Sequence, residues 1–283
     1  MRKPEPILIV IFILSSIALA INVTSIATDE WIISTATYSL ASKPSLINYG
    51  LFAGFLENYL ISNPFKYLLT ATCNYSEGKC MYSCHKTSEK RQEEIIKIIN
   101  HENLEPCDPN TENSFFHFQL KNGNIKEKAN KKDLLNDNHF IGSGYWVCTV
   151  TCLIITLIFS TTGCIFSIIN CFWSPVEPIL NIFGLFIWNG IAAGFGFLTM
   201  IIWGILYETT LKYNVAITDT LRYPDPYSSD GLSNLGYSYF ILLAEISFSL
   251  INIGLLVLRN YLLSKIPPPV IIDTGVDTML TFY

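Results

Sequence analysis

The stretch from Gly184 to Tyr207, GLFIWNGIAAGFGFLTMIIWGILY, decides the fold of this chain. It is long enough to cross a bilayer as a helix, and it carries no charged residue. Hydrocarbon cannot satisfy the amide of Asn189, so this helix needs protein neighbours. The stretch also holds two small-xxx-small steps, which let transmembrane helices approach closely: Gly190 with Gly194, and Ala192 with Gly196. We therefore predict packing against other helices of the same chain, with the seam of a homo-oligomer as the alternative.

The rest of the chain supplies such neighbours. Of its 283 residues 50% are hydrophobic and only 14% are charged, which is typical of a protein with several apolar spans. With the central span placed at 180–207, three further runs are long enough to cross a bilayer: 7–27, 145–169 and 237–262. We predict an all-α, left-handed four-helix transmembrane bundle. For the first run a cleaved signal peptide is the alternative, because Ala18 and Ala20 form a small-x-small site.

Basic residues that flank the spans predict the orientation in the plasma membrane. The terminal ends of the first and fourth spans carry Arg2, Lys3, Arg259 and Lys265. We therefore expect both termini in the cytoplasm, although the loop between the third and fourth spans opposes this bias with Lys212 and Arg222. The predicted cytoplasmic segments are 1–6, 170–179 and 263–283. The predicted extracellular loops are 28–144 and 208–236, and loops of this kind usually carry function.

The first loop is expected to be partly β. Residues Trp31 to Tyr38 alternate in polarity and are rich in β-branched side chains, and a second strand-like stretch surrounds Tyr49 to Phe52. We predict two or more short strands there. Isoleucines at near-helical spacing between Thr87 and Asn103 indicate an amphipathic helix, with Ser88 as its cap. The Lys- and Asn-rich segment 121–138 has little to bury, and we expect it to be solvated.

Four of the eight cysteines lie in this first loop: Cys73, Cys80, Cys84 and Cys107. An even number of cysteines in an oxidising compartment predicts two disulfides that staple the loop, with three pairings open. The alternative is a zinc site built on Cys80, Cys84 and His85, but extracellular thiolates oxidise more readily than they remain metal ligands. We therefore expect no metal and no cofactor.

Two kinds of covalent modification are suggested by short motifs. Asn74-Tyr-Ser76 is a glycosylation sequon in the first loop, whereas the sequon at Asn22 lies inside the first apolar run and should be out of enzymatic reach. Cys171 is placed at the cytoplasmic end of the second span beside two aromatic residues, which suggests reversible palmitoylation. Cys148 and Cys152, on the same span, are expected to be small packing residues.

Glu245 is the ionisable residue that lies well inside a span, which makes it a functional candidate. It falls about two turns from the predicted outer boundary, where its carboxyl can be protonated, snorkel or meet polar groups such as Asn189. We favour a packing role over an ion path, because no series of intramembrane charges accompanies Glu245.

The remaining sequence signals concern partners. The net charge of −5 without a long basic run gives no reason to expect nucleic acid. The chain shows no Ser/His/Asp order, HExxH motif or phosphate-binding glycine loop, so we expect no enzyme. Three prolines end the fourth helix at residues 267–269 and project a tail that ends in Thr281, Phe282 and Tyr283. This tail is a candidate ligand for a cytoplasmic PDZ-type scaffold.

The first loop of this four-span chain resembles that of the claudin-like superfamily. The superfamily pattern is Trp, Gly-Leu-Trp, Cys, Cys, and its counterparts here are Trp31, Gly50, Leu51, Phe52 in place of the second Trp, Cys73, and Cys80 or Cys84. Other features resemble the clarins: the run from Tyr49 to Gly54, the Trp-Asn-Gly of a third span that ends in Glu208, and the short tail ending in Tyr283. The additional cysteines and the insertion between residues 87 and 138 depart from the compact claudin-like loop.

The resemblance implies a tetraspan plasma-membrane glycoprotein of sensory hair cells and photoreceptors. It further implies a non-enzymatic organiser that couples membrane partners, such as channel or adhesion complexes, to actin-based or synaptic structures. Two alternatives remain open: a claudin-type adhesion or barrier protein, and an auxiliary subunit that modulates an ion channel.

Overall fold

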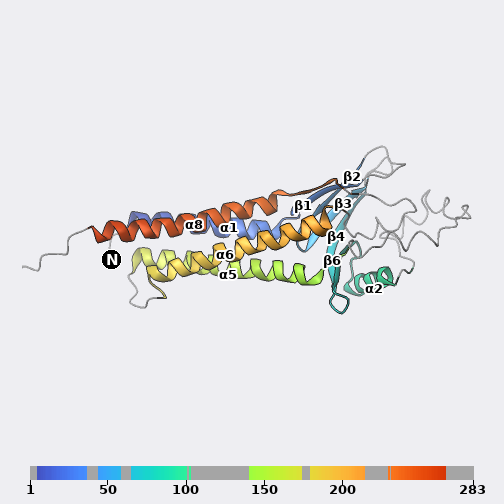
Figure 1. Ribbon diagram of the computed structural model, residues 1–283, viewed down its shortest axis with the longest axis horizontal. Coiled ribbons are helices and arrows are strands. Elements are labelled where there is room, and N and C mark those ends of the chain that lie inside the picture. Colours follow the sequence, from blue (N-terminus) through green and yellow to red (C-terminus); the bar gives the residue numbers. More distant parts are fainter. Residues whose placement is uncertain are drawn as a thin grey trace, which may run out of the picture.

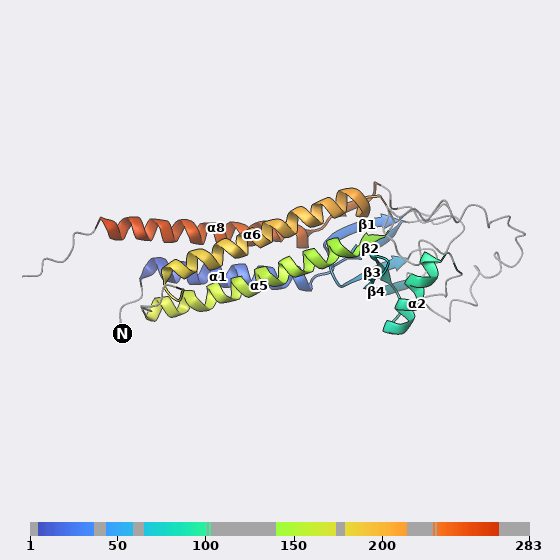
Figure 2. The same cartoon turned by 60° about the horizontal axis from the view of Figure 1, so that its bottom comes forward.

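The computed structural model describes residues 5–36, 44–58, 65–100, 102, 140–173, 179–213, 229 and 231–265. These residues form a bundle of long helices with an antiparallel sheet at one end of it (Figure 1). Figure 2, turned by 60°, shows the same division along the long axis of the molecule. We call the two ends of the bundle the sheet end and the terminal end, because α1 begins and α8 ends at the second one.

Four of the described helices are long and apolar enough to cross a membrane. They are α1 (Pro6–Ala27), α5 (Ser143–Phe172), α6 (Ile182–Leu206) and α8 (Tyr237–Ser264). Each contains most of one of the predicted spans, and α6 continues into a short π-helix, η3 (Tyr207–Leu211). Pro6 starts α1, a position where the missing N–H of proline costs nothing. The prediction of four helices long and apolar enough to span a membrane is confirmed.

The helices form a ring in which α1 and α6 each pack against both α5 and α8. Small and polar residues are mixed with large apolar ones on the buried faces, and many large apolar side chains also point outward. On α6, for example, Ala192 and Thr199 are buried, while Phe197 is 56% exposed. This arrangement suits a bundle in lipid, where helices associate through close packing and side-chain hydrogen bonds rather than through hydrophobic burial.

The sheet has seven antiparallel strands in the order β6-β5-β4-β3-β2-β1-β7. They are β1 (Ile32–Ala36), β2 (Ser45–Tyr49), β3 (Ala53–Asn58), β4 (Phe65–Asn74), β5 (Lys79–Ser83), β6 (Ile141–Gly142) and β7 (Ser233–Leu235). Six strands lie between α1 and α5, as a partly β loop predicts. The seventh comes from the segment between α6 and α8, where we predicted no strand, and it pairs with β1 through Ile33 opposite Asn234.

One further helix, α2 (Ser88–Ile99), packs on β4 and β5. Its buried residues Ile95 and Ile98 form a small core with Met81 of β5 and with Phe140. The predicted amphipathic helix is therefore present, but the predicted cap is wrong. Ser88 is the first helical residue, and the capping position belongs to Thr87, whose side chain makes no capping hydrogen bond.

Candidate functional site

Trp31 links the sheet to the bundle. It lies just before β1 and is fully buried, and its indole Nε1 donates a hydrogen bond to the Ser25 carbonyl of α1 over 2.7 Å. Its ring meets Trp203 of α6 and Tyr239 of α8 edge to face, with centroids 5.2 and 6.5 Å apart. One side chain thus contacts three helices at the sheet end. Buried aromatic contacts of this geometry fix orientation as well as burying apolar area.

Two glycines let the backbones on either side of Trp31 approach closely. A Cβ on Gly50 would lie 2.7 Å from the carbonyl oxygen of Thr28, and a Cβ on Gly236 would lie 2.0 Å from that of Glu30. The main chain of Trp31 uses this proximity, because its N–H donates to the Tyr49 carbonyl and its carbonyl accepts from the N–H of Gly236. Only glycine fits at these two points.

The turn between β2 and β3 reaches α5. The carbonyl of Leu51 accepts a 2.8 Å hydrogen bond from the indole of Trp146, and the ring of Phe52 packs edge to face on the same indole. Leu51 is buried, whereas Phe52 is 43% exposed. Trp31, Gly50, Leu51 and Phe52, chosen from the sequence as one motif, therefore lie together around the sheet end of the bundle.

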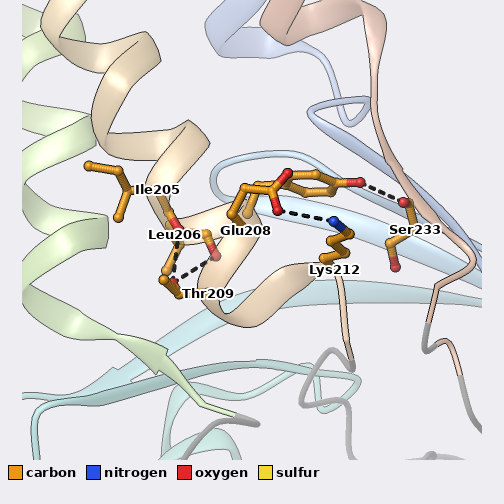
Figure 3. Close-up of polar contacts among 7 residues, drawn as sticks. Ile205, Leu206, Glu208, Thr209, Lys212 and Ser233 are labelled. Carbon is orange, nitrogen blue, oxygen red and sulfur yellow. Dashed lines mark hydrogen bonds and ion pairs between the residues drawn. The ribbon is translucent and has the colours of Figure 1, made fainter.

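The end of α6 makes a further connection to the sheet (Figure 3). The hydroxyl of Tyr207 donates to the Ser233 carbonyl of β7 over 2.7 Å. Glu208 of the π-helix η3 and Lys212, which directly follows this helix, form an exposed ion pair of 3.0 Å, and the hydrogen bond between them raises the pKa of the Lys212 ammonium. Sequence reasoning missed Tyr207, Trp146, Trp203 and Tyr239 as junction residues, because an aromatic residue in an apolar run carries no signal of its partner.

Three of the four cysteines in the first loop lie among the described residues, and all three are disulfide-bonded. Cys73 and Cys80 face each other across β4 and β5 and are disulfide-bonded. Cys84 is disulfide-bonded as well, and Cys107 lies outside the described residues. Cys84 lies close to His85 and Glu94, a set with metal-ligand chemistry. Because both Cys80 and Cys84 are oxidised, neither offers the thiolate that zinc binding needs, and the structure supports the staple.

Asn74 lies at the turn between β4 and β5 and is partly exposed. Its side-chain oxygen accepts hydrogen bonds from the N–H and the hydroxyl of Ser76, and Gly78 completes the turn at a φ of 67°. The sequon thus stands at a hairpin tip. Asn22, by contrast, is completely buried within the bundle.

Glu245 is fully buried in the bundle. One carboxyl oxygen, Oε1, accepts hydrogen bonds from Ser160 of α5 at 3.2 Å and from Ser249 of α8 at 3.3 Å. The suggestion that Glu245 meets Asn189 is wrong, because the Asn189 side-chain oxygen instead accepts from Asn252 of α8 at 3.1 Å. Asn189 nevertheless bonds to a neighbouring helix, as we predicted for a polar amide within an apolar span.

The two small-xxx-small steps of α6 lie on different faces of the helix, one buried and one exposed. Gly196 is buried, and a Cβ there would lie 2.9 Å from Glu245 Oε2, so this glycine makes room for α8 as predicted. Gly190 and Gly194 are exposed, and a Cβ on either would meet nothing within 4 Å. The prediction of intramolecular packing is wrong for this pair, because the helix rotation that buries Ala192 and Gly196 turns Gly190 and Gly194 outward.

The cysteines of the second span also differ from expectation. Cys171 is only 7% exposed and packs with Leu8, Leu185 and Leu256, so the structure does not support its palmitoylation, which needs an accessible thiol. Cys152 is a buried packing residue as expected, but Cys148 is exposed. The candidate PDZ ligand, Thr281 to Tyr283, and the segment 121–138 lie outside the described residues.

Two curated proteins are similar to part of this chain. It is 30% identical to Clarin-3 of Rattus norvegicus over 98 residues, which are 34% of this chain and 42% of that protein. It is 26% identical to Clarin-3 of Homo sapiens over 111 residues, which are 38% of this chain and 47% of that protein. Each match spans less than half the length of the relative. No protein-family model matches the chain. The similarity supports a clarin-like relationship for part of the chain.

Proposed function

We propose that this tetraspan membrane protein is a clarin-like, non-enzymatic organiser of the plasma membrane. Its sheet domain would hold membrane or extracellular partners, its cytoplasmic tail would hold a PDZ-type or actin-linked scaffold, and the bundle would connect the two. The observation that carries this proposal is the junction around Trp31, where one buried side chain contacts three of the four spanning helices.

The junction supports mechanical and positional coupling. The sheet is attached to α1, α5, α6 and α8 by separate contacts, so it cannot rotate freely on the bundle. A partner bound to the sheet would therefore have a fixed position relative to the helices, including the end of α8. This geometry suits an organiser, whose task is to hold several proteins in a defined arrangement.

Two features support the orientation with the sheet outside the cell. The sheet carries disulfide-bonded cysteines, and disulfides persist in oxidising compartments. The Asn74 sequon stands on the same part, at an accessible hairpin turn. A mobility shift that disappears with glycosidase, and with Asn74→Gln, would place this turn in the secretory lumen during synthesis. An unchanged mobility would remove this support.

The experiment that tests the function is imaging of an internally tagged chain in cells that have both free, actin-rich protrusions and cell contacts. Enrichment in protrusions that is lost when residues 266–283 are deleted supports the organiser. Enrichment only where two expressing cells meet supports claudin-type adhesion instead. A uniform distribution that the deletion does not alter contradicts the coupling to a scaffold.

A matched pair of variants tests the junction in the same cells. Trp31→Ala removes the contacts with three helices, whereas Phe52→Ala removes a partly exposed ring of the same motif that contacts Trp146 of α5 alone. If coupling matters, proximity labelling from the sheet and from the tail should report overlapping partners for Phe52→Ala but not for Trp31→Ala at equal surface levels.

A further inference from the structure

Three side chains with metal-ligand chemistry meet where α2 packs on the sheet, and the proposed function does not use them. Cys84 and His85 directly follow β5, and Glu94 lies in the middle of α2. The ligand atoms of all three lie within 4.8 Å of one another. The side chains of His85 and Glu94 are only 9% and 2% exposed. The cluster is therefore enclosed by the fold and is not a chance group on the surface.

The carboxylate of Glu94 has one satisfied oxygen and one unsatisfied oxygen. Its Oε2 accepts a hydrogen bond from the hydroxyl of Ser83, which itself accepts from the backbone N–H of His85 at 3.2 Å. Its Oε1 is buried and accepts no hydrogen bond, although Nε2 of His85 lies 3.5 Å away. A buried carboxylate oxygen without a partner is costly, and a bound ion is one way to satisfy it.

The spacing of these two ligand atoms suits tetrahedral zinc. Bonds of about 2.1 Å from zinc to nitrogen and to oxygen, at a tetrahedral angle, place the two atoms about 3.4 Å apart. The separation of His85 Nε2 and Glu94 Oε1 is 3.5 Å. Imidazole, thiolate and carboxylate together favour zinc, because calcium and magnesium prefer oxygen ligands alone. One thiolate and one carboxylate also neutralise the two charges of the ion, which favours a buried site.

The disulfide of Cys84 controls the third ligand. A disulfide sulfur offers no thiolate to zinc. A dithiol reductant supplies two electrons and two protons and becomes a disulfide itself, while the bond of Cys84 breaks and Cys84 and its partner are released as thiols. Zinc then displaces the thiol proton of Cys84. A newly made chain is in this reduced state before an oxidising compartment forms its disulfides.

We propose that Cys84, His85 and Glu94 bind zinc in the reduced chain, and that the disulfide of Cys84 excludes the ion. A water molecule completes the tetrahedron. The site differs from the one considered from the sequence, because Glu94, and not Cys80, lies with the other two ligand atoms. Zinc thus holds α2 against the sheet until the disulfide of Cys84 forms.

The test uses the full chain, purified in detergent without a polyhistidine tag, because such a tag binds zinc. One sample stays oxidised. The other is reduced with a phosphine, because a dithiol would compete for the metal. After gel filtration the reduced wild type should retain one zinc ion per chain, and the oxidised wild type should retain none. Cobalt in place of zinc should give the visible bands of a tetrahedral ion and a thiolate-to-cobalt charge-transfer band in the reduced sample alone.

Alkylation of the reduced wild type locates the site without any substitution. Zinc should suppress the alkylation of Cys84, because a thiolate bound to the metal no longer acts as a nucleophile. Cys148 has an exposed thiol, and its alkylation should not change. Mass spectrometry reads both cysteines in one sample. Equal alkylation of Cys84 with and without zinc overturns the proposal.

Matched variants separate this site from other thiols of the chain. Cys84→Ser, His85→Ala and Glu94→Gln should each lose the bound zinc. Ser83→Ala removes the hydrogen bond that orients the carboxylate and should weaken zinc binding about tenfold. Cys148→Ser should retain the ion.

Three results contradict the zinc site: no zinc in the reduced wild type, equal zinc in the oxidised and reduced samples, or zinc retained by Cys84→Ser. The first two results and the alkylation pattern come from the wild type. They decide the matter even if a variant does not fold.

Discussion

At the scale of single residues, Trp31 is the side chain on which the attachment of the sheet most depends. Trp31→Ala should lower the free energy of unfolding by about 3–5 kcal/mol, because it removes a fully buried indole and leaves a cavity among three helices. Trp31→Phe keeps a ring but loses the hydrogen bond to Ser25, and should cost about 1–2 kcal/mol. Unfolding in detergent, followed by tryptophan fluorescence and circular dichroism, measures both.

Phe52→Ala is the control within the same motif. Because this ring is 43% exposed, its loss should cost less than about 1 kcal/mol. Equal losses for Trp31→Ala and Phe52→Ala would contradict the assignment of the junction to Trp31.

Tyr82 predicts a dependence of stability on alkaline pH. Burial raises the pKa of its phenol above the usual value, and the nearby charge of Asp29 raises it further. Burial also raises the pKa of Tyr49, with which Tyr82 is in ring contact. Above about pH 10 the unfolded phenols lose protons that the folded ones keep, so the folded state becomes less favoured as pH rises.

The loss should amount to at most about 1.4 kcal/mol per pH unit for each such phenol. Thermal unfolding between pH 8 and pH 11 measures it, with Tyr82→Phe as the comparison. This variant should show a shallower alkaline decline, but it should be less stable at neutral pH by about 1 kcal/mol, because the Tyr82 hydroxyl no longer donates to the Gly50 carbonyl. An identical pH profile in both proteins would refute the assignment.

At the scale of elements, the hairpin of β4 and β5 depends on its cross-strand disulfide. Replacing Cys73 and Cys80 together by alanine should lower stability by about 2–3 kcal/mol, because the closed loop no longer restricts the unfolded chain. Cys148→Ala, which changes an exposed thiol, serves as the control and should stay within about 0.5 kcal/mol. Unfolding curves with and without reductant check the result, and curves that coincide for wild type and the double variant would count against the staple.

The contact of α6 with α8 depends on the glycine that faces inward. Gly196→Val should destabilise the bundle by about 1–3 kcal/mol, since a Cβ would lie 2.9 Å from Glu245 and 3.2 Å from Ile246. Gly194→Val makes the same chemical change on the exposed face of the same helix. Both variants alter helix propensity equally, so the difference between their Tm values in detergent isolates the packing. No difference would mean that α6 does not present the Gly196 face to α8.

At the scale of the whole molecule, the two halves of the chain are tied together at both ends of the fold. Between residues 1–175 and 176–283 the structure has helix contacts of α1 with α8 and of α5 with α6, and the pairing of β1 with β7. The two fragments, expressed together, should therefore associate and co-purify in detergent.

Gly236→Val in the second fragment should reduce this association at least about tenfold, which corresponds to about 1.4 kcal/mol. Its side chain would collide with the main chain of Glu30 in the first fragment. Gly254→Val is the control, because a Cβ at Gly254 meets nothing within 4 Å. Equal recovery of all three fragment pairs would show that the sheet does not help to join the halves.

Much of this architecture could be predicted from local signals. Spans show in the sequence because each needs a long uncharged run, and the disulfides show because an even set of cysteines stands in a polar loop. β7 could not be predicted, because Ser233 to Leu235 is too short to show alternation and becomes a strand only beside β1. The outward position of Gly190 and Gly194 was missed for a related reason. A small-xxx-small step marks a close approach but does not say which face of the helix makes it.

The sequence by itself determined the number of spanning helices, the presence of a stapled and partly β segment, and the motif residues from Trp31 to Phe52. These depend on hydrophobicity, length and short-range pattern, which each segment carries on its own. Only the tertiary structure decided that Trp31 meets Trp203 and Tyr239, that Cys73 pairs with Cys80, and that Glu245 bonds to Ser160 rather than to Asn189. Those contacts join residues from separate elements, and they depend on the rotation and register with which helices and strands pack together.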